Sequence, residues 1–337
     1  MKNNKTKSKY TAENLETIRN RQEPFRRKCL PSYIEEIEWE QEALFNIAWQ
    51  NNLDLQSFAE NYFNSTIKDY VDMLVVRCTT MTGMELYEEF EKDKLFSNVK
   101  VVNKEDRRHL WQYEWVGVFY VNLMLATFIT TKDLIKTIPV QWVLDRINGL
   151  HDKDVSLVAR QVVEDVYKII CFHNPNEPNA YLSNWYYSDF EVNNVKFTSM
   201  EQYFMYAKAE LFEDKEIAEQ ILKTNDFAKV KKLGRKVRNF GNKTWNENKE
   251  QLIKKGIKAK FEQNPILKEK LLQTEDAILC ECAVKDKVWG IGLSMTNPDR
   301  LDPNKWQGQN LLGKALMEVR DELRNTQWRK NQETQKP

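Results

Sequence analysis

The chain has 337 residues, enough for two ordinary domains, and its 41% hydrophobic and 12% aromatic content is ample for packed cores. Its 51 basic and 50 acidic residues leave a formal net charge of +1. This balance excludes a globally charged surface for nucleic acid or membrane lipids, although local patches stay possible.

The ends and the cysteines indicate where the protein works. The N-terminus is basic, but no apolar stretch follows it, so it is not a signal peptide. The most apolar run, Trp115 to Ile129, is too short to span a bilayer. Five cysteines are few and odd in number, which favours reduced thiols over a disulfide framework. We therefore expect a cytoplasmic protein without membrane contact, with disordered tails at residues 1–10 and 326–337.

The first half, residues 11–165, is predicted to be an all-helical domain. Glycine is scarce there, and charged residues are spaced between Leu, Ile, Trp and Phe. The predicted helices cover 34–49, 54–63, 66–77, 83–92, 107–130, 131–150 and 155–167. Nothing in this half predicts catalysis, and its role and partner are left open.

The second half, residues 166–325, is predicted to be an α+β domain. A β-rich run at 166–172 precedes a loop, and two short strands flank the turn Asn193–Asn194. Helices are predicted at 199–212, 215–223, 226–235, 244–263, 264–274 and 310–324. A hairpin is predicted from strands at 277–284 and 288–293 around a turn at 285–287.

Cysteine and histidine offer a weak case for a metal. Cys171 and His173 share one face of a strand, and so do Cys280 and Cys282. Structural zinc sites usually use C-x-x-C rather than C-x-C spacing, so buried thiols are the preferred interpretation. The sequence also lacks a P-loop, a G-x-S-x-G motif and a complete G-x-G-x-x-G motif. We expect neither a metal nor another cofactor.

The predicted helix 199–212 carries a candidate ligand face. Glu201, Met205 and Lys208 fall at i, i+4 and i+7, so a carboxylate, a soft apolar surface and an amine share one stripe. An ordinary alternative exists, because Thr198 and Glu201 have the spacing of a capping box. From these residues alone, the cap is preferred for Glu201, and a solvated amine is preferred for Lys208.

Two tryptophans are candidate stacking platforms. Asp286 lies in a turn, where aspartate ordinarily serves the turn itself, and Trp289-Gly290-Ile291-Gly292 follows it. The glycines leave a face of the Trp289 ring open for a flat ligand. Trp245, near a helix start, is a second candidate. Each tryptophan alone is also an ordinary core side chain.

A basic run extends from Lys229 to Lys260. It contains twelve Lys and Arg residues against two glutamates. An anionic ligand with phosphates, or a nucleic acid, would balance this local excess. Helix faces in water would explain it equally well, so both interpretations stay open.

Taken in order, these pieces resemble the YbiA-like, or NADAR, family. The matching segments cover nearly half the chain, and they are Leu182–Tyr186, Ser199–Phe204 with Ala207–Ala209, Lys232–Arg235, Trp245, Ala259–Asn264, Leu279-x-Glu281, Asp286–Gly292 and Gly308–Arg320. Trp185 departs from the family, which more usually has a Phe-type aromatic there. The first half of the chain lies outside the resemblance.

The resemblance implies an N-glycosidase that hydrolyses a ribose–nitrogen bond without a metal. It implies the catalytic residues Glu201, Asp286 and Lys208, and for Glu201 it reverses the preference for a cap. Lys208 would hold a phosphate, pair with Glu201 or attack an opened ribose as an amine nucleophile. The implied substrate-binding residues are Asn184, Trp245, Trp289, Gly290, Arg235, Lys236 and Asn310.

Three functions compete. The first is removal of ADP-ribose from a guanine base, so that the partner is an ADP-ribosylated base or nucleic acid; the basic run favours it. The second is cleavage of phosphoribosylated metabolites, the ribosylated intermediates of riboflavin biosynthesis. The third is a non-catalytic NAD- or ADP-ribose-binding module with a helical partner domain.

Overall fold

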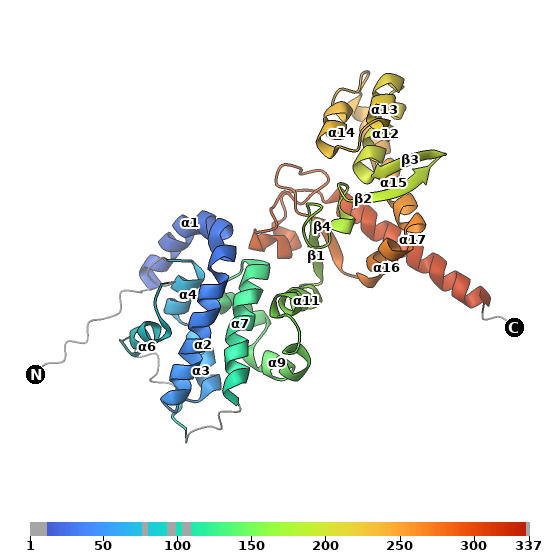
Figure 1. Ribbon diagram of the computed structural model, residues 1–337. Helices are drawn as coiled ribbons and strands as arrows, with labels where there is room; N and C mark the ends of the chain where they lie inside the picture. The colour runs from blue at the N-terminus through green and yellow to red at the C-terminus, as the bar shows by residue number, and fades with distance from the viewer. Residues whose placement is uncertain (1–11, 76–79, 93–98, 103–108, 335–337) are drawn as a thin grey trace, which may run out of the picture. The chain divides into compact units, whose positions relative to one another are not determined.

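The computed structural model describes residues 12–75, 80–92, 99–102 and 109–334 (Figure 1). The chain divides into two compact units. One runs to Tyr167 and includes Thr296–Pro298, and the other comprises Lys168–Met295 and the chain from Asp299 onward. The predicted N-terminal tail, residues 1–10, and Cys78 lie outside the described residues.

The first unit is all-helical over its described residues. Its helices are α1 (Ala12–Cys29), η1 (Leu30–Tyr33), α2 (Ile34–Gln50), α3 (Leu55–Phe63), α4 (Thr66–Asp72), α6 (Gly83–Lys92), α7 (Leu110–Thr127), α8 (Thr131–Thr137), α9 (Val140–Leu144), α10 (Ile147–Leu150) and α11 (Val155–Tyr167). Helix α1 was not predicted, because it is highly polar and contains Pro24, which both weaken the helical signal.

Two predicted helices of this unit were too long. The helix predicted at 131–150 is broken into α8, α9 and α10, since Pro139 pushes Ile138 out of the helical region to φ −124° and ψ 83°. The helix predicted at 66–77 ends at Asp72, and Leu74 turns the chain with a φ of 54°. Residues 76–79 of that prediction lie outside the described residues.

Helices α2 and α7 form the centre of this unit and lie side by side (Figure 1). Gly117 on α7 lets them approach closely, because a Cβ there would come within 3.1 Å of the Phe45 ring. Among the described residues, no single helix is long and apolar enough to cross a bilayer, although α7 and α8, bent by 97°, pass that test together.

Charged side chains in this unit are buried in pairs. The Lys68 ammonium binds Asp72, and neither side chain is exposed. The other Asp72 oxygen accepts the Thr131 N–H at 2.6 Å. Arg26, 1% exposed, donates to the carbonyls of Asp72 and Phe128 at 2.6 and 2.7 Å. These contacts fasten α1, α4 and α8 together.

The second unit confirms the predicted α+β class, with many helices and few short strands. Its elements are β1 (Ile169–Phe172), η4 (Ala180–Leu182), β2 (Tyr187–Val192), β3 (Val195–Ser199), α12 (Met200–Leu211), α13 (Lys215–Leu222), α14 (Phe227–Gly234), α15 (Asn242–Gln263), α16 (Pro265–Gln273), β4 (Ile278–Glu281), η5 (Pro298–Leu301), η6 (Pro303–Lys305) and α17 (Leu311–Thr334). Strand β1 is shorter than predicted because α11 extends to Tyr167 and Lys168 turns the chain at φ 55°.

The described strands pair in two small sheets. Strands β2 and β3 form an antiparallel hairpin, in which Asn193 and Asn194 have φ angles of 53° and 63° as a type I′ turn requires. Strand β1 pairs with β4 in parallel, with Cys171 opposite Cys280.

The predicted second hairpin is wrong. Residues 288–293 form a loop, and β4 pairs with β1 instead. The backbone carbonyls of this loop bond to the start of α17: Leu311 and Leu312 donate to the carbonyls of Val288 and Trp289 at 3.1 Å. Alternating apolar residues predict a strand but carry no information about its partner, which here is 109 positions away.

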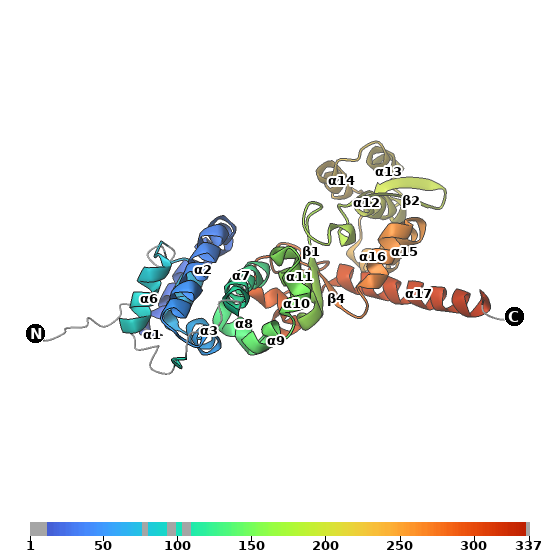
Figure 2. The same ribbon diagram turned by 60° about the horizontal axis from the view of Figure 1, so that its bottom comes forward.

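Helix α12 lies at the centre of the second unit and packs against α13, α14, α15 and β3 (Figure 2). Helix α17 continues to Thr334, so residues 326–334 are helical rather than a disordered tail. The chain there contains Gln, Arg, Lys and Glu with neither glycine nor proline, so little opposes the helix. Residues 335–337 lie outside the described residues.

Candidate active site

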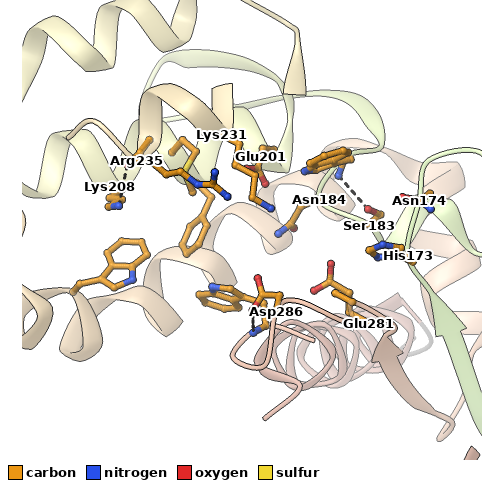
Figure 3. Close-up of a pocket in the computed structure, with 17 residues that line it drawn as sticks. His173, Asn174, Ser183, Asn184, Glu201, Lys208, Lys231, Arg235, Glu281 and Asp286 are labelled. Carbon is orange, nitrogen blue, oxygen red and sulfur yellow. Dashed lines mark hydrogen bonds between the residues drawn. The ribbon is translucent and has the colours of Figure 1, made fainter. Parts of the chain in front are cut away.

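A cavity of roughly 340 Å³ opens in the second unit (Figure 3). This size falls within the range of pockets that bind small organic molecules. Seven of the predicted site residues line it, namely Asn184, Glu201, Lys208, Arg235, Trp245, Asp286 and Trp289. Gly290, Lys236 and Asn310 are not among its lining residues.

The N-terminus of α12 differs from the predicted capping box by one residue. Ser199 is the N-cap, and its hydroxyl accepts the Gln202 N–H at 3.2 Å. The Gln202 side chain returns to the Thr198 N–H at 2.9 Å. Because Gln202 takes the part predicted for Glu201, the Glu201 side chain is released from capping and faces the cavity.

Glu201 is a buried carboxyl, 6% exposed, on the cavity wall. Its backbone N–H donates to the Asn184 carbonyl at 2.9 Å. Burial raises the pKa of Glu201, and the neighbouring Asp286 charge adds to this effect. The charges of Lys231 and Arg235, and a hydrogen bond that Trp185 makes to the Glu201 carboxyl, lower this pKa. Cations therefore surround this carboxyl more than anions do.

Glu281 is a second buried carboxyl that the sequence analysis did not select. Burial raises its pKa to about 8, and the charges of Asp286 and Glu201 contribute to the rise. Lys231 is the cation that opposes it. One sequence signal points to this residue. Glu281 lies inside an otherwise apolar run, Ile278 to Ala283, and a glutamate is rarely buried unless it is paired.

Asn310 and Gly290 contact the end of β4, next to Glu281. Asn310 is buried; its amide donates to the Leu279 carbonyl at 2.9 Å and accepts the Glu281 N–H at 3.2 Å. A Cβ on Gly290 would lie 2.8 Å from the Glu281 carbonyl. Both residues were predicted to bind substrate; in the structure their contacts go to the end of β4, and neither is among the residues that line the cavity.

Asp286 serves its turn and also reaches the cavity. Its Oδ1 accepts the N–H groups of Val288 and Trp289 at 3.1 and 2.9 Å. The Asp286 carboxylate therefore stabilises its own turn, as expected for an aspartate at this position. The carboxylate also lines the cavity and raises the pKa of Glu281 and Glu201.

Lys208 lies near the cationic end of the cavity. Its Nζ donates to the Gly234 carbonyl at 2.9 Å and lies over the rings of Phe240 and Trp245, at 4.3 and 5.6 Å from their centroids. The hydrogen bond of its Nζ goes to this carbonyl, whereas one implied role paired the amine with Glu201. Burial lowers the pKa of Lys208.

The basic run divides into cavity residues and structural residues. Lys231 and Arg235 line the cavity, whereas Lys236 is exposed and lies outside it, because neighbouring residues at the end of a helix point about 100° apart. Three other members are paired: Arg238 with Asp214, Lys254 with Glu318 and Lys258 with Glu322.

One further member of the run holds the cavity wall in place. Lys260, 1% exposed, donates to the carbonyls of Tyr181 and Ser183 at 2.7 and 3.4 Å. Burial lowers the pKa of Lys260 to about 7. Because Asn184 follows these carbonyls directly, the buried amine positions the loop that carries it.

Aromatic rings line the middle of the cavity. Phe204 packs edge-on against Trp289, with ring centroids 5.0 Å apart, and lies 5.2 Å from Trp245. Trp185, which departs from the family pattern, stacks on Phe227 at 5.7 Å while also lining the cavity. Such faces suit a planar base or a sugar ring.

The end opposite Lys208 is neutral and polar (Figure 3). His173, Asn174, Ser183 and Asn184 lie there beside Glu281. His173 Nδ1 and Asn184 Oδ1 are buried, with no hydrogen-bond partner among the described residues. Burial lowers the pKa of His173, so this imidazole is largely uncharged at neutral pH. A bound ligand with polar edges would satisfy both atoms.

The cavity thus offers cations at one end, rings in the middle and polar groups with carboxyls at the other. Comparison with known proteins identifies its family. The NADAR domain matches residues 171–324. An N-glycosidase of Acanthamoeba polyphaga mimivirus is 39% identical over 163 residues, which cover 46% of this chain and 96% of that protein. The chain belongs to the NADAR family.

Two further relatives place the NADAR domain in context. The N-glycosidase YbiA of Escherichia coli (strain K12) is 30% identical, over 49% of this chain and 92% of that protein. Its NMR structure aligns with 29% identity and a TM-score of 0.40, over 48% of this chain and 87% of that one. A riboflavin biosynthesis protein of Vibrio vulnificus is 30% identical over 46% of this chain, but the match spans 38% of that protein.

Proposed function

We propose that the NADAR domain of this chain is an N-glycosidase that removes ADP-ribose from a guanine base. The reaction class, hydrolysis of an N-glycosyl bond, follows from the family and from relatives named for it. The choice of ADP-ribosylated guanine as substrate is our own inference from the cavity.

One observation supports the proposal most strongly: two buried carboxyls in one cavity have unequal electrostatic surroundings. Burial and like charges raise the pKa of Glu281 to about 8, so it carries a proton at neutral pH. Burial also raises the pKa of Glu201, but Lys231, a hydrogen bond from Trp185 and Arg235 oppose this rise and favour its anionic form. Unequal environments of this kind typically separate an acid from a base.

The proposed reaction uses each carboxyl once. As the bond between C1′ of the ribose and the base nitrogen breaks, positive charge develops on the sugar, and the Glu201 carboxylate stabilises it. Glu281 donates its proton to the departing base. Water attacks C1′ and gives its proton to a carboxylate, so that ribose gains a hydroxyl and the base leaves neutral. Asp286 raises the pKa of Glu281, which favours the proton on the acid.

The cationic end of the cavity supports a substrate with phosphates. Arg235 lines it beside Lys208, and the Lys231 ammonium lies further along, 5.4 Å from the centroid of the Trp185 ring. These cations with the Lys208 amine suit the pyrophosphate of ADP-ribose. The polar end would then receive the base, with Asn184 Oδ1 and His173 Nδ1 as partners for its edge. The rings of Trp289 and Phe204 lie between the two ends.

A second candidate function is cleavage of a phosphoribosylated intermediate of riboflavin biosynthesis. The Vibrio vulnificus relative named for riboflavin biosynthesis supports it. Such a substrate carries one phosphate, which leaves part of the cationic end without a counter-charge. For this reason we place it second.

Two substrates separate the candidates. The full chain is incubated with an oligonucleotide carrying ADP-ribosylated guanine, or with the pyrimidine ribosylamine phosphate, and the released sugar is quantified. Free ADP-ribose from the oligonucleotide supports the proposal. Consumption of the ribosylamine alone replaces it with the second candidate, and turnover of neither substrate overturns both.

Lys208 needs a test of its own, because two roles fit its position. A lowered pKa favours the neutral amine that a nucleophile needs, whereas its place beside Arg235 favours phosphate binding. Borohydride added during turnover would reduce a Schiff base between Lys208 and the opened ribose. A mass increase on Lys208 assigns it as the nucleophile, and an unmodified chain assigns it to phosphate binding.

A further inference from the structure

The second unit contains a cluster of cysteines that the proposed reaction does not use. Parallel pairing of β1 with β4 sets Cys171 opposite Cys280, and Cys282 follows two positions later. The three Sγ atoms all lie within 4.8 Å of one another, and those of Cys171 and Cys280 are 3.5 Å apart. Cys280 and Cys282 are 0% and 1% exposed, whereas Cys171 is partly exposed.

The spacing of these sulfurs fits a metal ion. Metal–sulfur bonds of about 2.3 Å place three thiolates around one ion at about 4 Å from each other. The observed separations bracket this value, so small side-chain movements would bring all three sulfurs onto one ion. Thiolates are soft ligands, which select Zn²⁺ and Cu⁺ over Mg²⁺ and Ca²⁺.

We propose that Cys171, Cys280 and Cys282 bind one thiophilic cation, Zn²⁺ or Cu⁺, behind the catalytic cavity. The ion takes no chemical part in the proposed N-glycosidase reaction. Sequence alone favoured buried thiols, because C-x-C spacing offers two ligands and the third lies 109 residues away. Parallel strand pairing brings that third ligand into place.

A buried cation near the cluster would balance the charge of a metal–thiolate site. The Arg300 guanidinium acts on Cys171 and Cys282. Arg300 is itself buried, at 4% exposed. Three thiolates with Zn²⁺ carry one net negative charge, which this arginine balances. With Cu⁺, one retained thiol proton would give the same balance.

An ion at this position would act on the cavity through β4. Glu281 lies between Cys280 and Cys282 in the chain and lines the cavity. Sulfur ligands on both sides of Glu281 would fix the backbone that presents this carboxyl. The bound ion would therefore stabilise the fold and hold the proposed acid in position.

The full chain, purified with its thiols reduced and without oxygen, is titrated with Zn²⁺ alone and with Cu⁺ alone. We expect one equivalent of one ion to bind, which also distinguishes the two. Cys171→Ser, Cys280→Ser and Cys282→Ser should each weaken binding at least about 10-fold. Cys29→Ser is the matched control and should bind like the unmodified chain, because Cys29 lies in the other unit.

X-ray absorption of the unmodified, ion-loaded chain keeps the proposal testable if the serine variants do not fold. Three sulfur ligands at about 2.3 Å are the expected result. Binding of well below one equivalent of either ion overturns the proposal. This holds whether the thiols stay free or Cys171 and Cys280 form a disulfide. Equal loss of binding in Cys29→Ser overturns it as well.

Discussion

Buried charge is arranged differently in the two units of this protein. In the first unit, Lys68 and Asp72 are fully buried and bind each other. In the second, Glu201 and Glu281 are buried in one cavity, where burial and the Asp286 charge raise the pKa of both. Similar burial thus accompanies opposite electrostatics.

The difference separates charges that stabilise the fold from charges that a reaction can use. A buried ion pair that satisfies itself fixes helices relative to each other and offers nothing to a ligand. Carboxyls gathered with like charges cost stability and are retained where a reaction needs their perturbed pKa. The comparison predicts that mutations in the two units will affect different measured properties.

The largest expected effect is the loss of catalysis in Glu201→Gln. Removing the carboxylate that stabilises the developing sugar cation should lower kcat about 10³-fold while the fold is kept. Single-turnover release of the sugar measures it. Glu210→Gln on the same helix is the control, since Glu210 pairs with Lys215 outside the cavity. Equal losses in both variants would refute the assignment.

Next is the stability of the first unit. Asp72→Asn leaves the buried Lys68 ammonium without its counter-charge, which should lower the free energy of unfolding by about 3–5 kcal/mol. Denaturant titration measures this change. Asp133→Asn breaks an exposed pair with Lys136 and should cost at most about 1 kcal/mol. Similar costs for the two variants would show that the buried pair is not structural.

A smaller effect is expected at Glu281, and it depends on pH. The proposed acid must be protonated, so activity of the unmodified chain should fall as pH rises through about 8, the pKa of Glu281. In Glu281→Gln, kcat at neutral pH should drop about 10²-fold, and this fall with rising pH should disappear. A pH–rate profile of both chains tests it. If activity of the variant still falls over the same pH range, a group other than Glu281 causes that fall.

The smallest effect is expected at the cationic end. Arg235→Gln removes a phosphate partner, so KM should rise about 10-fold with kcat nearly unchanged. Lys236→Gln provides the matched control, because the Lys236 side chain is exposed and lies outside the cavity, next to Arg235 in the chain. If both substitutions raise KM equally, the basic run attracts the substrate through its overall charge instead of at a defined position.

Local patterns predicted much of the second unit, including the shared face of Glu201, Met205 and Lys208. Helical spacing depends on near neighbours, and the structure places all three on the cavity wall. The cap was misplaced by one residue because Ser199 with Gln202 satisfies the same spacing as Thr198 with Glu201.

Contacts between distant segments could not be predicted in the same way. The importance of Glu281 comes from burial beside Asp286 and from the brace by Asn310, and neither leaves a periodic signal. The hairpin predicted at 277–293 failed for the same reason, since strand alternation does not identify the partner strand.

We infer that the buried carboxyls of the NADAR domain perform chemistry, whereas the buried ion pair of the first unit stabilises the fold. The decisive measurement is single-turnover cleavage by the folded full chain, comparing Glu201→Gln with Asp72→Asn. We predict a loss of about 10³-fold for Glu201→Gln and a rate within a few-fold of the unmodified chain for folded Asp72→Asn. Substantial cleavage by Glu201→Gln, or an equal loss in folded Asp72→Asn, would show that Glu201 does not carry the reaction.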